Sequence, residues 1–278
     1  MRLFRHGAVG AERAGAVDRN GVNRDLSLLV PDITPDWLSP EKLAAIAAID
    51  LTKLPALPAG VRPGAPVAGV RQFIAIGLNY SKHAAETGAQ PPKEPIVFNK
   101  AITCMQGPND EVRLPEGSTQ MDWEVELGVV IGTTARRVPV DKALAHVAGY
   151  CLANDVSERH WQIHRGGQWV KGKSFDTFGP LGPFLVTADE IPNPQNLPLS
   201  LKVNGEVRQN SNTSDMIFSV AEIVAHLSLF MTLLPGDVIV TGTPEGVGLG
   251  MKPPTFLKRG DVMEVQGGIL GSQRQTVV

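Results

Sequence analysis

The chain has 278 residues, 42% hydrophobic and 19% charged, which is enough to bury a sizeable core as one large domain, or as one large and one small domain. A formal net charge of -2, with no stripe of Lys and Arg interleaved with aromatic residues, argues against a nucleic-acid-binding protein. No window approaches the roughly 18 apolar residues of a membrane span, and the N-terminus lacks the apolar segment of a signal peptide, so we expect a cytoplasmic protein that binds no membrane.

The first part of the chain is predicted to be a small N-terminal α+β domain, residues 1–66. It contains strand-like pieces at 1–4, 15–18 and 24–28. One helix is expected over 39–48, because Ser39 is a good N-cap and Pro40 suits the first helical position. The stretch 54–66 is rich in Pro and Gly and is therefore the best candidate for a domain boundary.

The rest of the chain, residues 67–278, has many strand patterns and few helices. Strands are expected at 73–77, 96–99, 124–132, 149–155, 183–187, 199–203, 237–241 and 261–266. Helices are expected at about 80–88, 140–147, 156–164 and 219–230. This pattern favours a strand-dominated α+β fold over a regular βαβ alternation.

In the helix expected at 80–88, His83 and Glu86 are three residues apart and so share one face. A glutamate bonded to one imidazole nitrogen fixes the tautomer and raises the basicity of the other nitrogen. The pair therefore suits the activation of water, although a solvated surface pair is the alternative.

In the strand expected at 124–132, Glu124 and Glu126 are two residues apart and project side by side. Two like charges held so close repel each other unless a cation or a proton is shared between them. A divalent metal site is the sharper hypothesis, and a strand with one wet, acidic face is the alternative.

A third carboxylate, Asp155, ends the strand expected at 149–155. Arg159 and Gln162 follow it at helical spacing, which brings an acid, a cation and an amide together on one face. Such a mixture is typical of a functional site. The alternative is that Asp155 is only the N-cap of the next helix.

Two lysines and one loop complete the candidate residues. Lys100 ends a strand and Lys173 follows a loop containing Trp and Gly, and either could stabilise a developing enolate rather than being merely solvated. The glycines of the loop 241–248 permit conformations that aim N–H groups at an anion, and Thr243 adds a hydroxyl donor. An ordinary hairpin turn is the alternative for this loop.

Four ordered motifs give the chain a resemblance to the fumarylacetoacetate hydrolase family, from about residue 70 to the end. They are Asp122-Trp-Glu-Val-Glu-Leu127, Gly149-Tyr150 through Arg159 with Gln162, Gly172-Lys-Ser-Phe-Asp-Thr-Phe-Gly-Pro180, and Thr241-Gly-Thr-Pro-Glu-Gly-Val-Gly248. The resemblance implies a mixed β-roll, a homodimer and a Mg²⁺ or Mn²⁺ site made by Glu124, Glu126 and Asp155. An all-oxygen ligand set suits these hard cations better than Zn²⁺.

The resemblance also implies roles for the other candidates. His83 is the general base, Glu86 orients it, and Lys173 holds the charge of an enolate. The implied substrate contacts are Tyr80, Lys100, Arg159, Gln162 and Thr243. The family's frequent Lys-Pro is here Lys100-Ala101, which favours Lys173 over Lys100, and Arg159-His160 replaces the Arg-Asp of many relatives.

The expected reaction is hydrolysis of a carbon–carbon bond in a 2,4-dioxo acid, giving pyruvate and a second carboxylic acid. The ending 270–275, together with Asp122-Trp123, resembles the subgroup of diketo-deoxy sugar acid hydrolases and points to a 2,4-diketo-3-deoxy sugar acid. Relatives with the same carboxylates include oxaloacetate decarboxylases, and isomerases and hydratases of 2-oxo-dioic acids, which remain alternatives. A protein that binds a metal and a 2-oxo acid without turnover is the third possibility.

Overall fold

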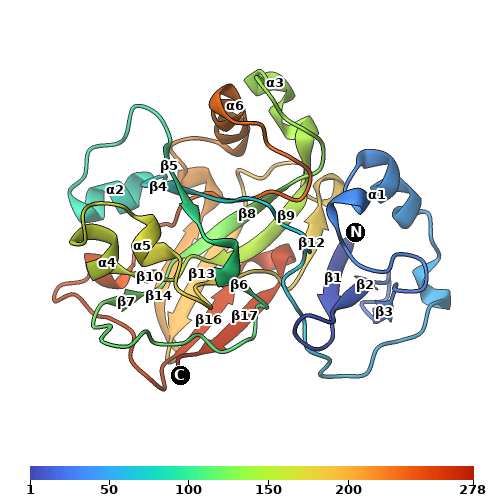
Figure 1. Ribbon diagram of the computed structural model, residues 1–278, viewed down its shortest axis with the longest axis horizontal. Helices are drawn as coiled ribbons and strands as arrows, with labels where there is room; N and C mark the ends of the chain where they lie inside the picture. Colours follow the sequence, from blue (N-terminus) through green and yellow to red (C-terminus); the bar gives the residue numbers. More distant parts are fainter.

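The computed structural model describes residues 1–278 and is built around a nine-stranded mixed sheet (Figure 1). The strand order is β3-β2-β1-β12-β9-β8-β15-β4-β5, and only β15 and β4 pair in parallel. Its strands are β1 Arg2–His6, β2 Arg13–Val17, β3 Asn23–Asp25, β4 Phe73–Gly77, β5 Ile96–Lys100, β8 Val125–Ile131, β9 Val147–Asn154, β12 Leu185–Thr187 and β15 Val238–Val240.

A second, four-stranded antiparallel sheet has the order β14-β13-β16-β17. Its strands are β13 Pro198–Val203, β14 Glu206–Asn212, β16 Val262–Gln266 and β17 Ser272–Thr276. Two short pairs complete the strands, β7 Met121–Asp122 with β10 Ser157–Glu158, and β6 Met105–Gln106 with β11 Gly179–Pro180. The expected strand-dominated α+β fold is confirmed, but β14 and β17 were not predicted.

The helices are few and short, as expected. They are α1 Pro40–Ala47, α2 Ser81–Thr87, α3 Val140–Ala143, α4 Arg159–Ile163, α5 Val170–Lys173 and α6 Val220–Phe230. Short 3-10 turns lie at Pro35–Trp37, Leu51–Lys53, Ile102–Cys104, Leu144–His146, Ala188–Glu190, Thr213–Asp215, Gly248–Gly250 and Gly268–Leu270. Ser39 caps α1 as predicted, because its hydroxyl accepts the Lys42 N–H at 3.3 Å. No helix has the length and apolar character needed to cross a bilayer.

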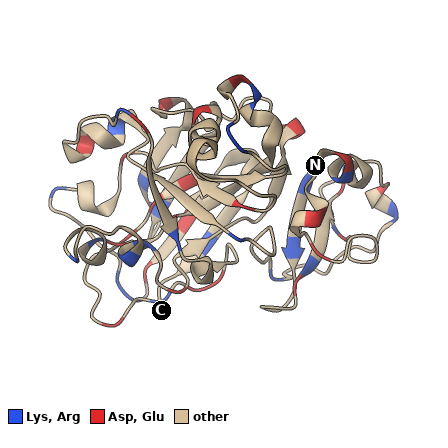
Figure 2. Cartoon of the chain, turned by 45° about the horizontal axis from the view of Figure 1, so that its top comes forward, with Lys and Arg blue, Asp and Glu red and all other residues tan.

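The N-terminal residues form a lobe at one side of the molecule, blue in Figure 1. Strand β1 pairs with β12, which pairs in turn with β9, so the lobe extends the same sheet as the rest of the chain. The division into domains at residue 66 stays a prediction. Acidic and basic residues are mixed along the whole chain rather than segregated (Figure 2).

The centre of the large sheet is β8 next to β9, and every residue of both strands is buried. Gly128 of β8 lies opposite Cys151 of β9, where an added Cβ would stand only 2.6 Å from the cysteine Sγ. A glycine at this position therefore lets the two strands pair closely. The start of β8 and the end of β9 then lie together, which places the polar residues found there.

Candidate metal centre and its cavity

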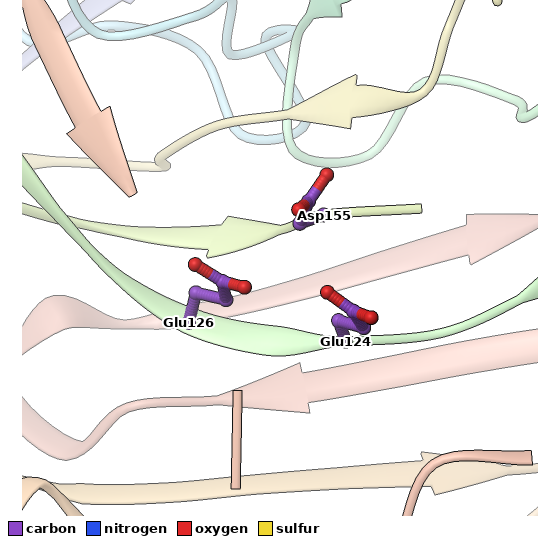
Figure 3. Close-up of side chains that lie close together, drawn as sticks. All are labelled: Glu124, Glu126 and Asp155. Carbon is purple, nitrogen blue, oxygen red and sulfur yellow. The ribbon is translucent and has the colours of Figure 1, made fainter. Parts of the chain in front are cut away.

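Three carboxylates converge where β8 begins and β9 ends. Glu124 precedes β8, Glu126 is its second residue and Asp155 follows the last residue of β9. One oxygen from each lies within 4.8 Å of the others, and all three side chains are buried. Figure 3 shows the three carboxylates gathered over these neighbouring strands. The prediction that these three acids lie together is therefore confirmed, whereas their role as metal ligands stays a prediction.

Cations surround two of the three acids. The Lys173 Nζ lies 2.7 Å from Glu124 Oε2 and 2.7 Å from Asp155 Oδ2. Lys100 donates to Asp155 and, at 2.5 Å, to the Lys173 carbonyl, so its ammonium is turned towards protein groups. Arg159 Nη1 is 2.6 Å from Glu124 Oε1. Both lysines therefore belong to the centre, with Lys100 supporting Asp155 and Lys173.

The two glutamates differ sharply in acidity. Burial disfavours the charged form of Glu124, but Lys173 and Arg159 outweigh it and lower the pKa to about 2. Glu126 forms no salt bridge, so burial, followed by repulsion from Asp155 and Glu124, outweighs the charge of Lys173 and raises its pKa well above the ordinary 4.5. The Gly242 N–H, 2.7 Å from Glu126 Oε2, is its one backbone donor. Glu126 is thus the acid that most needs a proton or a metal cation.

The donor chemistry of the centre fits a divalent cation. With all four acids ionised, the buried acids Asp122, Glu124, Glu126 and Asp155 and the cations Lys100, Arg159 and Lys173 give 3 minus 4, a net charge of -1. A divalent cation would change this charge to +1, which suits an anionic substrate. Three carboxylates without a thiolate or imidazole suit Mg²⁺ or Mn²⁺.

The raised pKa of Glu126 gives a pH dependence that can be tested. Because the folded pKa lies above that of the unfolded chain, the contribution of the proton to stability is complete below about 4.5 and is lost as pH rises through the raised value. We therefore expect the melting temperature of chelator-treated protein to fall over this range, and added Mg²⁺ to stabilise it more at higher pH. In Glu126→Gln this fall should be reduced. A fall of the same size in the variant would contradict the assignment to Glu126.

The helix after Asp155 starts later than predicted. Residues 157–158 form β10, α4 begins at Arg159, and the Glu158 carboxylate caps it by accepting the His160 N–H at 3.2 Å. The alternative that Asp155 is the N-cap is therefore wrong, and Asp155 does not share a helix with Arg159. The acid and the arginine instead approach from two different elements.

Asp122 holds Arg159 in place from β7. Its Oδ2 accepts from the Arg159 Nε at 2.8 Å, and its two oxygens accept the N–H groups of Gly248 and Leu249 at 2.7 and 3.0 Å. This fully buried acid was noted in the sequence only as part of a family motif. It links the centre to the end of the loop 241–248 and to the 3-10 turn Gly248–Gly250 that follows.

Asp122→Asn is expected to destabilise the protein by about 3–5 kcal/mol, because it leaves Arg159 as a buried cation without its main partner. Denaturant unfolding measures this loss. The matched control is Asp141→Asn, at a side chain 74% exposed, which should change stability by less than about 0.5 kcal/mol. Equal stability of the two variants would show that Asp122 does not hold Arg159.

His83 and Glu86 come together on α2 as predicted. The His83 Nδ1 is 3.4 Å from Glu86 Oε2, which leaves Nε2 as the other ring nitrogen. Glu86 also accepts the Gly246 N–H, at 3.0 and 3.2 Å from its two oxygens. The glutamate is therefore fixed from two sides and can orient the imidazole ring.

The loop 241–248 aims its N–H groups at anions, but at those of the protein itself. The N–H groups of Gly242, Gly246 and Gly248 bind Glu126, Glu86 and Asp122, respectively. Gly242 and Gly246 have φ values of 97° and 96°, which residues with a side chain rarely adopt. The expectation that these N–H groups are aimed at an anion therefore holds, and the anions are carboxylates of the protein itself.

The Thr243 hydroxyl is also bonded within the protein. It donates to the Val125 carbonyl at 3.0 Å and accepts from Gln209 Nε2 at 2.8 Å. Because its one hydroxyl proton is already donated to the Val125 carbonyl, Thr243 cannot donate a hydrogen bond to a substrate. It can only accept one or make van der Waals contact.

Three buried amides that the sequence did not reveal support the centre. Asn154 Oδ1 accepts the Glu124 N–H at 3.1 Å, and its amide donates to Gln275 Oε1 at 3.1 Å. Gln209 Oε1 accepts the Val125 N–H at 2.9 Å. Gln209 and Gln275 lie on β14 and β17, the two strands that the sequence patterns do not predict. The one sequence feature that indicates a strand there is glutamine at alternate positions in Ser-Gln-Arg-Gln-Thr.

A cavity of about 220 Å³ opens onto the centre. Its polar lining includes His83, Glu124, Glu126, Arg159, Gln162, Lys173 and Thr243. Tyr80 is not part of this lining. It is fully buried with an unbonded hydroxyl, and burial, with Glu126 nearby, raises its pKa well above 10.0. Seven of the eleven predicted site residues thus line one cavity, while Tyr80, Glu86, Lys100 and Asp155 are not part of its lining.

Comparisons with known proteins found a matching family model and similar proteins that cover most of the chain. A family model described as the fumarylacetoacetate (FAA) hydrolase C-terminal domain matches residues 72–278. A Burkholderia ambifaria protein with the provisional name of hydrolase is 56% identical over 277 residues, covering 99% of this chain and 98% of its own length.

Three solved structures are also similar over the whole of this chain. A fumarylacetoacetate hydrolase from Exiguobacterium antarcticum has a TM-score of 0.87 and 37% identity, with 99% of that chain covered. A maleylpyruvate hydrolase from Sphingobium sp. SYK-6 has a TM-score of 0.83 and 31% identity, with 99% covered. A 5-carboxymethyl-2-hydroxymuconate delta-isomerase from Mycobacterium smegmatis has a TM-score of 0.79 and 34% identity, with 98% of that chain covered.

Proposed function

The chain belongs to the fumarylacetoacetate hydrolase family, and we propose that it hydrolyses a 2,4-dioxo acid to pyruvate and a second carboxylic acid. The similar proteins include both hydrolases and an isomerase, so an enzyme of this group is supported. The observation that carries the hydrolase proposal is that His83, oriented by Glu86, lines the same cavity as Glu124 and Glu126 of the three-carboxylate centre.

The first step is attack by water. His83, with Nδ1 held by Glu86, accepts a proton from water at Nε2. The resulting hydroxide equivalent adds to the 4-carbonyl carbon of the substrate. The arrangement needs no cysteine or serine nucleophile, and no covalent intermediate with the protein.

The second step breaks the bond between C3 and C4. The electron pair of that bond becomes the C2–C3 double bond and the π pair of the C2 carbonyl moves onto its oxygen, giving the second carboxylic acid and the enolate of pyruvate. Lys173 and Gln162 line the cavity and stabilise the oxygen that becomes negative, Gln162 through its amide nitrogen, because its oxygen already accepts from Arg159 Nη1 at 3.0 Å. Transfer to C3 of the proton that His83 took from water completes pyruvate and restores the neutral imidazole.

Glu124, Glu126 and Asp155 would hold Mg²⁺ or Mn²⁺ in this proposal. When bound, the cation supplies Lewis-acid polarisation of the substrate oxygens. Lys173 and Arg159 keep Glu124 ionised, so this ligand is ready at neutral pH. We also propose that the protein is cytoplasmic and forms a homodimer. A monomer in light scattering would contradict the homodimer.

The alternatives use the same carboxylates differently. Decarboxylation of oxaloacetate needs no activated water, and isomerisation of a 2-oxo-dioic acid needs only proton transfer. Decarboxylation does not explain why Glu86 is held against His83 by a second bond from the Gly246 N–H, whereas isomerisation would use the pair for proton transfer alone. Hydrolysis uses the whole pair.

The test is pyruvate release from a panel of 2,4-dioxo acids and oxaloacetate, assayed with Mg²⁺, with Mn²⁺ and with chelator. We expect pyruvate from at least one 2,4-dioxo acid, loss of turnover with chelator and recovery when the metal is restored. Pyruvate from oxaloacetate alone would make the protein a decarboxylase. No pyruvate from any compound would overturn the proposal.

A further inference from the structure

The cavity has a charged end and an apolar wall. Eight of its seventeen lining residues are hydrophobic. The Lys173 Nζ stands 5.3 Å from the centre of the Phe98 ring, and the Phe98 and Trp169 rings meet edge to face with centroids 5.2 Å apart. The wall therefore leads away from the charged end in the order Lys173, Phe98, Trp169. Ile163, with 42% of its surface exposed, lies where the lining reaches solvent.

The position of the indole is built into the fold. Trp169 is the residue before α5, and Lys173 is the last residue of the same short helix, so one element supplies both the cation and the aromatic wall. Gly77 ends β4 beneath the indole, and an added Cβ there would lie 2.3 Å from the Trp169 ring. A glycine at residue 77 thus makes the space in which the indole packs.

The apolar wall has no cation to offer. Besides His83, the cationic residues in the lining are Arg159 and Lys173, and both are bonded to acids at the charged end. The Thr87 hydroxyl donates to the His83 carbonyl at 3.0 Å. A carboxylate buried along this wall would have no charged partner, and a row of hydroxyls would lose hydrogen bonds to water.

We infer that Phe98, Trp169 and Ile163 form the specificity pocket for the group carried on the 4-carbonyl, and that this group is short, uncharged and apolar. The inference rests on the proposed function, because it assumes that the 2-oxo acid end binds at the charged centre. The volume of about 220 Å³ is below the roughly 300–1,000 Å³ of pockets for drug-sized ligands. The substrate class is then a small acylpyruvate, rather than a 2,4-diketo-3-deoxy sugar acid or a dioic acid.

The experiment compares kcat/KM for 2,4-dioxo acids with methyl, propyl, phenyl, carboxyethyl and dihydroxyethyl groups on the 4-carbonyl. Wild type should prefer the methyl and propyl compounds over the carboxyethyl and dihydroxyethyl compounds by at least about tenfold, since an apolar pocket disfavours even one added hydroxyl by about 10²-fold. Trp169→Ala should shift the phenyl-to-methyl ratio upwards by at least about tenfold. Gln168→Ala, at the exposed neighbour, should leave the ratio unchanged.

A variant designed to gain activity on a charged substrate tests the pocket assignment independently. Ile163→Arg places a cation at the outer end of the wall and, being partly exposed, should fold. It should raise the carboxyethyl-to-methyl ratio by about tenfold. A wild type that releases pyruvate but prefers the carboxyethyl or dihydroxyethyl compound would overturn the inference and leave the hydrolase proposal standing. No pyruvate from any compound would overturn both.

Discussion

Glu126→Gln is expected to lower turnover of a 2,4-dioxo acid by at least about 10³-fold under saturating Mg²⁺. The reason is that the change removes one of three oxygen ligands and the charge that balances the metal, while keeping the side-chain shape. Loss of Lewis-acid stabilisation worth several kcal/mol corresponds to this factor. Calorimetric titration with Mn²⁺ should show a matching loss of affinity.

The melting temperature of Glu126→Gln shows whether lost activity comes from unfolding. Because the pKa of Glu126 is raised, the metal-free protein favours a neutral side chain at this position. Glutamine should therefore leave the melting temperature of chelator-treated protein unchanged or higher at neutral pH, so lost activity cannot be ascribed to unfolding. Glu116→Gln, at an exposed residue, is the matched control and should retain full turnover. Full metal-dependent turnover in Glu126→Gln would remove the ligand assignment.

His83→Ala is expected to lower kcat by about 10²–10⁴-fold, the usual contribution of a general base. Metal affinity should be unchanged, because His83 contacts Glu86 and none of the three carboxylates is among its hydrogen-bond partners. Steady-state rates combined with Mn²⁺ titration measure both quantities on one preparation.

Two comparisons sharpen the His83 prediction. Glu86→Gln should cost less than His83→Ala, since it weakens orientation of the base but retains the base itself. His226→Ala, on α6, removes a histidine that does not line the cavity and should leave kcat unchanged. Wild-type turnover in His83→Ala would argue for decarboxylation, which requires no activated water.

The grouping of the three acids could be predicted because it depends on local geometry. The two-residue repeat of a strand places Glu124 and Glu126 on one face, and pairing of β8 with β9 brings Asp155 to the same end. The strand-dominated fold was likewise visible, since the runs in β4, β8 and β15 are rich in apolar and β-branched residues.

Other features depended on contacts between distant residues. β14 and β17 are mostly polar, and their buried Gln209 and Gln275 are satisfied by Val125, Thr243, Asn154 and other partners far away in sequence. Residues 157–158 pair with β7 instead of starting a helix, a choice made by a strand more than thirty residues earlier. Local propensity could not predict these pairings.

The destination of the glycine-rich loop was also hidden. Its N–H groups were expected to bind an anion, but the sequence could not show that Glu126, Glu86 and Asp122 supply the negative charges. Glu126 belongs to the metal centre, Glu86 orients His83, and Asp122 holds Arg159 in place. The loop therefore fixes all three parts of the site relative to one another.

The most direct test of the central claim is the product balance of wild-type protein with Mg²⁺ and acetylpyruvate. We expect one pyruvate and one acetate for each acetylpyruvate consumed, with both products lost when chelator is added. Consumption without acetate, or equal rates with chelator and with Mg²⁺, would contradict metal-dependent hydrolysis at the Glu124, Glu126 and Asp155 centre.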